Sequence, residues 1–445
     1  MPTHPTRRQF MIRYGAGLVG MAGLGAIDVR RLAAAAVPST EEPPTLVVLY
    51  LRGGADPINS IVPYGDPLYR NIRPTIAIPS PGELEDASQC VMPINEYFGF
   101  HPAMKPLAEL WEAGRMVPIM NAGSTHPTRS HFDAQDFMER AAPGIKSVTE
   151  GWLNRYLYDT RSGEDGDLRA VSLQPTLPRS LRGQYPVLAV PDYGADEAMA
   201  AFERLYACDS NAEAKQKNAP AEAKPTPADA SPEDQARQRI LEAGTEGIAK
   251  LRHLNGILRG SGGSDAAYPD SHLARQFRDL AKVIKAGEGL EIAAIDYNGW
   301  DHHAFQGGPD GTHASMLGNI SQTIKAFTDD LGPVRMQKTL VLCMSEFGRT
   351  VRENGNHGTD HGRGGYMMAI GGMVEGGRFY GDWTGLERQN LVDGRDLPVS
   401  RKSDFRLIFA EALHALFGFD TDEHDFFPDY KAREKPLGFL KPITA

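Results

Sequence analysis

Residues 45–51 read Thr-Leu-Val-Val-Leu-Tyr-Leu, an unbroken run of apolar and β-branched side chains. Such a run predicts a strand that is buried on both faces, as the strands of a parallel sheet are. The run ends in Arg-Gly-Gly-Ala-Asp-Pro at residues 52–57, where the glycines allow a sharp turn and Asp56 follows the strand. Ligands of open α/β sheets bind beyond the carboxyl ends of the strands, so this stretch predicts both a sheet and the edge that carries its site.

The alternation of strands and helices continues along the chain. Further buried strands are expected at residues 116–121, 291–297, 338–345 and 366–371. Helices are expected at residues 102–113, 131–140, 314–331 and 405–417. The pattern predicts an α/β fold, with a doubly wound, mostly parallel sheet and helices on both faces.

The first 36 residues have the order of an export signal. Five arginines stand against one aspartate, and the pair Arg7-Arg8 precedes a Gly- and Ala-rich apolar run at residues 14–27. Alanines at positions 33–36 then suit a signal peptidase. The arginine pair indicates the twin-arginine route, so its export machinery is an expected partner and the periplasm or cell exterior the expected location. The alternative is a loose basic tail.

Composition limits the class of the remaining chain. The protein has 445 residues, a net charge of −10 and three widely spaced cysteines. An acidic chain does not suit a nucleic-acid binder, and these cysteines match neither a disulfide framework nor a metal motif. No stretch approaches the ~20 apolar residues of a stable membrane span. Residues 37–445 are expected to form one domain, in which the Ala-, Pro-, Lys- and Glu-rich segment 211–238 is a surface insertion.

Carboxylates and imidazoles follow the predicted strands, as candidate metal ligands would. These residues are Asp56, Asp301, His303, Glu346, Asp360 and His361. Such groups bind Zn²⁺, Mn²⁺ or Ca²⁺, depending on the ratio of nitrogen to oxygen ligands. Two ions together would stabilise both the attacking and the leaving oxygen of an ester hydrolysis. Simpler roles remain open: Asp56 as a helix N-cap, and Glu346 in a surface ion pair with Arg349 or Arg352.

A hydroxyl-rich segment, residues 124–131, lies between the strand at 116–121 and the helix at 131–140. A helix N-terminus offers free backbone N–H groups and partial positive charge, which suit an anion. A hydroxyl there could be a nucleophile activated by a metal, and Arg129 could bind an anionic group with two hydrogen bonds. The alternative role of Ser130 is ordinary capping of the helix.

Four segments together resemble a known family. They are LVVLYLRGGADPINSIVPYGDPLYRNIRPTIAIP from Leu46, TRSHFDAQDFME from Thr128, GWDHHAFQ from Gly299 and MSEFGRTVRENGNHGTDHGRGG from Met344. The chain is similar to the exported bacterial proteins of domain-of-unknown-function family 1501. That family is placed in the alkaline-phosphatase-like superfamily, which includes the sulfatases, and the resemblance covers nearly all of residues 37–445. It implies an alkaline-phosphatase-like α/β fold.

The superfamily resemblance also implies roles for particular residues. Asp56 holds the place of the aspartate ligand after the first strand. Thr125, in Thr-His-Pro-Thr-Arg, is in the place of the nucleophile of the sulfatase pattern Cys-x-Pro-Ser-Arg, with Ser130 as its rival. The sulfatase cysteine itself is absent. Asp301 with His303 follows the superfamily order but lacks its Asp-x-x-x-His spacing, and either Glu346 or the pair Asp360-His361 takes the place of the Asp-His pair after a later strand.

The sequence thus leads to an exported, metal-dependent hydrolase that acts on a small anionic phosphate or sulfate ester. Thr125, Ser130 and Arg129 are its catalytic candidates. The alternative is an alkaline-phosphatase-like protein without catalytic activity, which binds or assembles at the cell surface. A third possibility is that the histidine-rich loops hold a single structural metal.

Overall fold

The computed structural model describes residues 42–162, 168–190, 247–260, 264–432 and 436–443. The expected export signal at 1–36 and the expected insertion at 211–238 lie outside these described residues. Within them, no helix combines the length and apolar character needed to cross a membrane.

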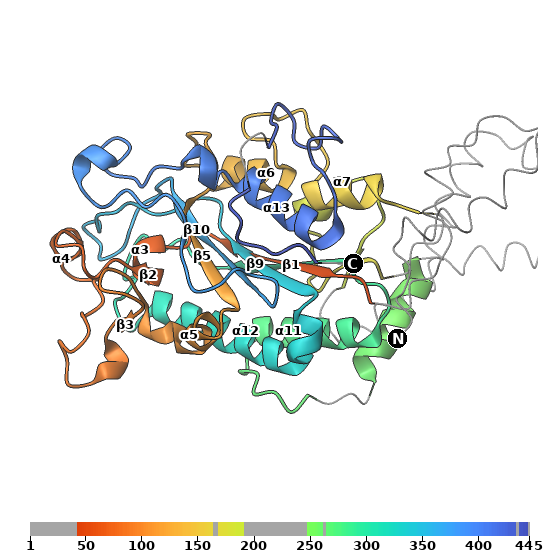
Figure 1. Ribbon diagram of the computed structural model, residues 1–445, viewed down its shortest axis with the longest axis horizontal. Helices are drawn as coiled ribbons and strands as arrows, with labels where there is room; N and C mark the ends of the chain where they lie inside the picture. The colour runs from red at the N-terminus through yellow and green to blue at the C-terminus, as the bar shows by residue number, and fades with distance from the viewer. Residues whose placement is uncertain (1–41, 163–167, 191–246, 261–263, 433–435, 444–445) are drawn as a thin grey trace, which may run out of the picture. The chain divides into compact units, whose positions relative to one another are not determined.

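An eight-stranded mixed sheet forms the centre of the fold (Figure 1), in the order β11-β5-β10-β9-β1-β8-β6-β7. The strands are β1 Thr45–Arg52, β5 Met116–Ala122, β6 Ala170–Ser172, β7 Leu188–Ala189, β8 Ile292–Asn298, β9 Thr339–Met344, β10 Gly365–Gly371 and β11 Tyr380–Gly381. β1 pairs in parallel with both β8 and β9. Only β10 runs antiparallel to its neighbours β5 and β9. The predicted α/β fold with a mostly parallel sheet is confirmed.

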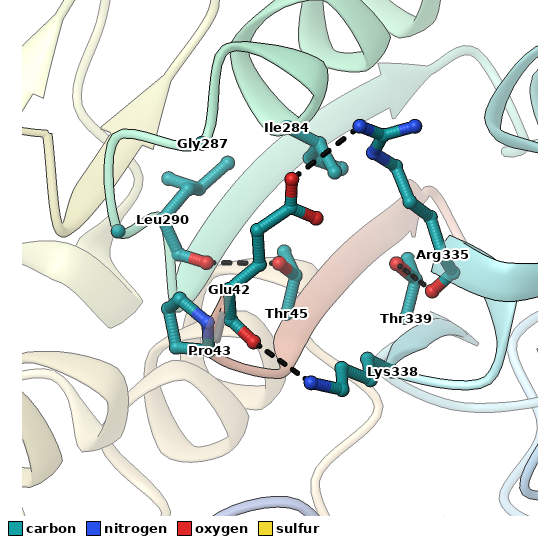
Figure 2. Close-up of a pocket in the computed structure, with 10 residues that line it drawn as sticks. Glu42, Pro43, Thr45, Ile284, Gly287, Leu290, Arg335, Lys338 and Thr339 are labelled. Atoms are coloured by element: carbon teal, nitrogen blue, oxygen red, sulfur yellow. Dashed lines mark hydrogen bonds and ion pairs between the residues drawn. The ribbon is translucent and has the colours of Figure 1, made fainter. Parts of the chain in front are cut away.

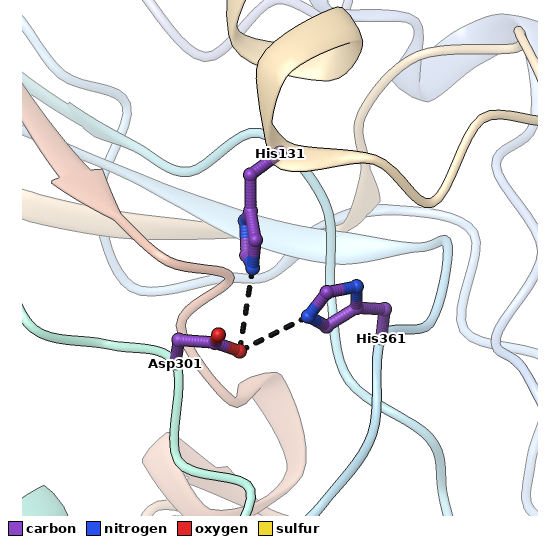
Figure 3. Close-up of side chains that lie close together, drawn as sticks. All are labelled: His131, Asp301 and His361. Carbon is purple, nitrogen blue, oxygen red and sulfur yellow. Dashed lines mark hydrogen bonds and ion pairs between the residues drawn. The ribbon is translucent and has the colours of Figure 1, made fainter.

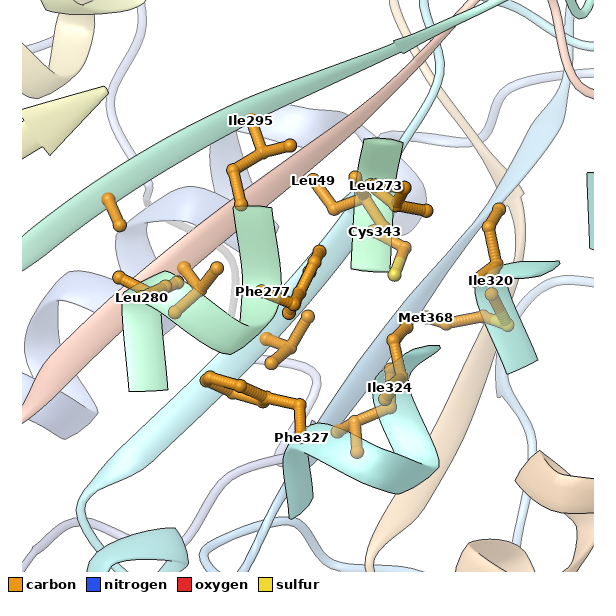
Figure 4. Packing of buried hydrophobic residues seen from close by; sticks show 14 of the residues in the cluster. Leu49, Leu273, Phe277, Leu280, Ile295, Ile320, Ile324, Phe327, Cys343 and Met368 are labelled. Carbon is orange, nitrogen blue, oxygen red and sulfur yellow. The ribbon is translucent and has the colours of Figure 1, made fainter. Parts of the chain in front are cut away.

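Helices cover both faces of the sheet, as the doubly wound pattern predicts (Figure 1). One face carries α5 Lys105–Glu112, α11 His272–Ala286 and α12 Thr312–Met336, and the other carries α6 His131–Arg140, α7 Trp152–Asp159 and α13 Phe405–Phe417. Alternate residues of β1 enter the two apolar cores: Leu49 packs on the α11 and α12 side (Figure 4), and Val48 on the α7 and α13 side. This double burial is the reason why the run at 45–51 has no polar face.

Smaller elements complete the fold, and most were not predicted. A three-stranded sheet contains β2 Ile61–Val62, β3 Met92–Pro93 and β4 Gly99–Phe100. Two four-residue helices are α3 Pro57–Ser60 and α4 Tyr69–Ile72. Short 3₁₀ segments are η2 Ala87–Gln89, η3 Pro102–Met104, η4 Arg179–Leu181, η5 Arg388–Asn390 and η6 Arg401–Ser403. The predicted helix at 314–331 is continued to Met336 only across a break at Gly332, where φ is 71°.

The two edges of the central parallel strands differ in character. At the amino edge, a cavity of about 20 Å³ lies between the starts of β1 and β9, lined by Glu42, Thr45, Arg335 and Lys338 (Figure 2). That volume holds about one water molecule, so the cavity is too small for a substrate. The carboxyl edge instead gathers the glycine-rich loops that carry most of the candidate ligands.

Candidate metal centre

Three strand ends deliver the candidate ligands to one place. Asp301 and His303 lie in the loop after β8, and His361 lies in the loop between β9 and β10. His131 is the first residue of α6, which follows β5. Because β5 and β9 both run antiparallel to β10, they point the same way, and their carboxyl ends share one edge with β1 and β8.

These four residues form what we call the His/Asp cluster: His131, Asp301, His303 and His361. The candidate ligand atoms of His131, Asp301 and His361 all lie within 4.8 Å of one another (Figure 3). The Oδ1 atom of Asp301 lies 3.3 Å from Nε2 of His131 and 3.1 Å from Nε2 of both His361 and His303. Three imidazoles therefore face one carboxylate through the same ring nitrogen.

The other ring nitrogen of each histidine is held by an acceptor. Nδ1 of His131 lies 2.7 Å from Oε1 of Glu346, and Nδ1 of His303 lies 3.0 Å from Oδ1 of Asp360. Nδ1 of His361 lies 2.7 Å from the carbonyl oxygen of Arg129. A carbonyl oxygen or an ionised carboxylate only accepts hydrogen bonds, so each Nδ1 carries the proton. With Nδ1 as the donor, Nε2 is the ring nitrogen that each histidine turns towards the cluster, as in metal-binding histidines.

The inward-facing nitrogens have partners that do not satisfy all of them with ordinary hydrogen bonds. Nε2 of His131 is buried, and no described residue forms a hydrogen bond with it. Nε2 of His303 lies 2.9 Å from Nε2 of His361. Two lone pairs at that distance repel unless a proton or a cation lies between them. The residues present therefore fit a bound cation: His131, Asp301 and His361 offer two nitrogens and one carboxylate, and Nε2 of His303 lies beside them.

Asp301 is held as an anion by its surroundings. Arg349 is fully buried, and its Nη1 donates to Oδ1 of Asp301 at 2.7 Å. Partial burial alone would raise the pKa of Asp301, but Arg349, His131 and His303 outweigh it and lower the pKa to about 2. The carboxylate is thus ionised at neutral pH and available to a cation.

Glu346 lies one layer behind the cluster instead of inside it. Its side chain is buried, and Oε1 accepts hydrogen bonds from His131, Gln135 at 2.8 Å and the backbone N–H of Gly53 at 2.9 Å. Burial would raise its pKa, but the hydrogen bonds from His131 and Gln135 lower it overall. The structure places this predicted ligand where it orients His131, and not in a surface ion pair with Arg349 or Arg352.

Asp360 takes a similar outer position. Its Oδ1 accepts from Nδ1 of His303 and, at 3.0 Å, from Nδ2 of Asn354. Burial would raise its pKa, yet these two neighbours lower it overall. Of the predicted pair Asp360-His361, the histidine faces the cluster and the aspartate supports a second histidine.

Asp56 is not brought to the His/Asp cluster. It is buried as the N-cap of α3, where Oδ1 accepts from the N–H of Ile58 at 3.1 Å and from Nη2 of Arg73 at 3.0 Å. Its Oδ2 accepts from Gln306 at 2.6 Å. Burial raises its pKa, but Arg73 prevails and lowers it to about 2. Asp56 therefore has the helix-capping role that the sequence left open.

The predicted catalytic residues lie on the loop before α6. Ser130 is exposed at the N-cap position, and its side chain makes no capping hydrogen bond. Thr125 donates to Asp404 at 3.4 Å. The guanidinium of Arg129 is occupied by Asp396, at 2.9 Å from Nε, and by Asp393, at 3.1 Å from Nη2. Arg129 therefore anchors the loop, and its carbonyl oxygen orients His361.

His131 was missed as a candidate ligand by the sequence analysis. The rule that found the others, polar residues after the carboxyl end of a strand, applies to it as well, because α6 is the next helix after β5. His131 closes the hydroxyl-rich segment 124–131, which was interpreted as the source of a nucleophile and an anion-binding arginine and not of a metal ligand. The supporting amides of Gln135 and Asn354 carry no signal in a single sequence.

Backbone hydrogen bonds join the loop after β8 to the loop between β9 and β10. Thr359 N–H donates to the carbonyl of His302 at 3.0 Å, and Phe305 N–H to that of Asn356 at 3.0 Å. A Cβ atom on Gly358 would lie 2.5 Å from the carbonyl carbon of His303, so only glycine permits this approach. Phe305 and His357 both adopt positive φ, at 49° and 55°. Non-glycine residues in that region are strained and persist only where neighbours hold them.

Comparisons with known proteins give a family but no activity. No curated protein matches this sequence. Among solved structures, the chain is similar to the zinc complex of the C-terminal periplasmic domain of EptC from Escherichia coli, with 10% identity, a TM-score of 0.32 and coverage of 75% of this chain and 74% of that one. It is also similar to the PsFucS1 sulfatase from Pseudoalteromonas sp., with 14% identity, a TM-score of 0.33 and coverage of 93% and 73%. The family model for proteins of unknown function DUF1501 matches residues 44–437, and the chain therefore belongs to that family.

Proposed function

We propose that this protein is an exported, metal-dependent hydrolase of phosphate or sulfate esters, and that its ion is bound by the His/Asp cluster. The observation that carries the proposal is the orientation of three imidazoles, whose Nδ1 atoms are all engaged while their Nε2 atoms converge on Asp301. Structural ion pairs have no need of this shared orientation, whereas metal-binding histidines regularly show it.

The donor set favours Zn²⁺ over Ca²⁺ and Mn²⁺. Two imidazole nitrogens and one carboxylate, with the imidazole of His303 beside them, match the ligands of a zinc site that keeps an open position, whereas calcium takes six to eight oxygens. Asp56 and Glu346 are engaged elsewhere, so the described residues supply one such donor set. We therefore propose one ion where the sequence allowed one or two.

A bound divalent ion would supply a Lewis acid that polarises the ester oxygen. The chain's own residues supply the remaining functions. Glu346, Asp360 and the carbonyl of Arg129 hold the three rings in one tautomer, and the buried Arg349 adds positive charge beside the anion site. Ser130 is the better supported nucleophile candidate, since its exposed hydroxyl precedes His131 and forms no capping bond, while that of Thr125 is directed to Asp404.

Metal content and ester turnover of the exported protein test the proposal. The wild type is expected to carry about one equivalent of zinc. His131→Ala and His361→Ala should each weaken zinc binding at least about 100-fold and abolish turnover of phosphate and sulfate esters. The matched control is His357→Asn, which changes an exposed histidine of the same loop and keeps a residue that tolerates its positive φ.

A folded wild type without metal, inactive on both ester classes with added Zn²⁺, Mn²⁺ or Ca²⁺, would contradict the proposal. Zinc bound at full stoichiometry without any ester turnover would contradict the hydrolase and leave a metal-binding protein.

A further inference from the structure

Three polar residues of α6 follow one another at intervals of four positions: His131, Gln135 and Glu139. Residues four positions apart lie on the same face of a helix, so these three form a stripe along α6. His131 is the member of the stripe that belongs to the His/Asp cluster (Figure 3). The partners of the other two members therefore bear on how the helix presents His131 to the cluster.

Arg52, the last residue of β1, contacts this stripe at two points. Its Nη1 and Nη2 atoms donate to the two carboxylate oxygens of Glu139, at 3.1 and 3.0 Å, and Nη1 also donates to Oε1 of Gln135 at 3.2 Å. Nη2 lies 2.8 Å from Oδ1 of Asp296 on β8. The Arg52 side chain is only 14% exposed. Two carboxylates thus hold the guanidinium in place, and from there it donates to the amide of Gln135.

The amide of Gln135 connects Arg52 with Glu346. A guanidinium only donates hydrogen bonds and an ionised carboxylate only accepts them, so the amide oxygen faces Arg52 and the amide nitrogen faces Glu346. Nε2 of Gln135 lies 2.8 Å from Oε1 of Glu346, the same oxygen that lies 2.7 Å from Nδ1 of His131. Loss of Arg52 would remove the donor that holds the amide in this orientation, and so would weaken the support of Glu346.

We infer that Arg52 is a positioning residue of the proposed metal centre, which acts through Gln135 and Glu346 on the orientation of His131. The bonds described above for its guanidinium go to Gln135, Glu139 and Asp296, none of which belongs to the His/Asp cluster. This inference rests on the proposed function. It adds a residue of the first strand that determines how tightly the ion is held without touching it.

Zinc affinity, measured by competition with a chelator of known affinity, tests the inference. Arg52→Met keeps an apolar stem and removes the guanidinium. We expect Zn²⁺ binding to weaken about three- to tenfold, because Arg52 is one hydrogen bond further from the ion than the outer partners whose loss costs about 10- to 100-fold. Arg52→Met also leaves the carboxylate of Glu139 without its cation, so the second variant combines Arg52→Met with Glu139→Gln, and the same loss is expected.

Glu139→Gln alone is the matched control. Glutamine keeps an oxygen that accepts from Arg52 and from the backbone N–H of Ser180, so Arg52 still reaches Gln135. Its zinc affinity should stay within about twofold of the wild type. The free energy of unfolding should fall, because a nearly buried ion pair is lost.

A double-mutant cycle separates positioning through Gln135 from a purely structural role. Once Gln135 is replaced by alanine, the further change Arg52→Met should alter zinc affinity by less than about twofold. Its effect on the free energy of unfolding of the metal-free protein should persist in that background, because the contacts with Glu139 and Asp296 are still lost. A purely structural role would change zinc affinity by the same factor with and without Gln135.

The possible results are distinguishable. Unchanged zinc affinity in both Arg52 variants overturns the positioning role while the metal site stands. An equal loss in Glu139→Gln, or the full effect of Arg52→Met without Gln135, also overturns it and assigns the effect to the docking of α6. A folded wild type that binds no Zn²⁺ overturns the proposed function and the positioning role with it.

Discussion

At the scale of single residues, the His/Asp cluster depends on which ring nitrogen each histidine turns inward. Asp301, His303 and His361 were predicted from their places after strands, and the structure brings them together. Glu346 and Asp360 were expected as ligands, but each accepts a hydrogen bond from Nδ1 of a cluster histidine, and no spacing in the sequence encodes which ring nitrogen turns inward. Asp56 shows that the same rule also selects residues with another role: it follows a strand, as the cluster residues do, but it serves as a helix cap.

Glu346→Gln tests whether the buried carboxylate acts through His131. Glutamine keeps the shape but removes the charge that fixes the proton on Nδ1 of His131. We expect zinc affinity to fall about 10- to 100-fold, as for other outer partners of metal ligands, with the fold retained. Competition with a chelator of known affinity measures the change. Gln135→Ala, which removes another donor to the same oxygen but keeps the carboxylate, should weaken zinc binding less; an effect as large as that of Glu346→Gln would contradict the assignment.

At the scale of elements, the five longer strands of the central sheet were predicted within about two residues, because continuous apolar runs define them, whereas the two- and three-residue strands β6, β7 and β11 were not predicted. The antiparallel direction of β10 could not be predicted, since its run Gly365–Gly371 is buried on both faces, as are the parallel strands β1 and β9. The backbone hydrogen bonds between the two loops could not be predicted either. They depend on contacts between residues more than 50 positions apart, such as the hydrogen bond from Thr359 to His302.

Gly358→Ala tests the close approach of these loops. Its new methyl group would meet backbone atoms of residues 302–304 at 2.5 to 2.7 Å, and backbone cannot rotate away as a side chain can. We expect a loss of about 1–3 kcal/mol in the free energy of unfolding, together with weaker zinc binding. Denaturant titration measures the first effect and chelator competition the second.

The chain offers a matched control for this substitution. Gly355, three residues earlier in the same loop, has open space where its Cβ would lie. Gly355→Ala should therefore leave both stability and zinc affinity close to those of the wild type. Equal effects of the two substitutions would show that loop flexibility, and not the close contact, matters.

At the scale of the whole molecule, buried histidines make the fold sensitive to acid. His101 is buried, accepts a hydrogen bond on Nδ1 from Ala103 and donates from Nε2 to the carbonyl of Gly308. Burial lowers its pKa to about 4, below the 6.5 of an unfolded chain. Between these values the unfolded state binds more protons, so the stabilising contribution of the neutral ring is complete above pH 6.5 and is lost as the pH falls towards 4.

The dependence of unfolding free energy on pH measures this effect. In the wild type, His101 should contribute up to about 1.4 kcal/mol per pH unit to the slope in that window. His101→Asn should lower the slope by that amount, since asparagine can still cap the following turn but does not titrate. His253→Asn, at an exposed histidine, is the control and should change the slope less than His101→Asn does. A slope unchanged by His101→Asn would exclude this residue as a source of acid sensitivity.

The chain positions of the cluster residues have a consequence for the order of events as the protein matures. His131 is separated from Asp301 by 170 residues and His361 follows Asp301 by 60, and the edge where they meet exists only once β5, β8 and β9 lie in one sheet. An unfolded or partly made chain therefore holds no more than isolated, weak donors. If the proposed ion binds there, its capture is the last step of assembly and not its trigger. The metal supply of the compartment in which the sheet closes would then determine which ion fills the proposed site.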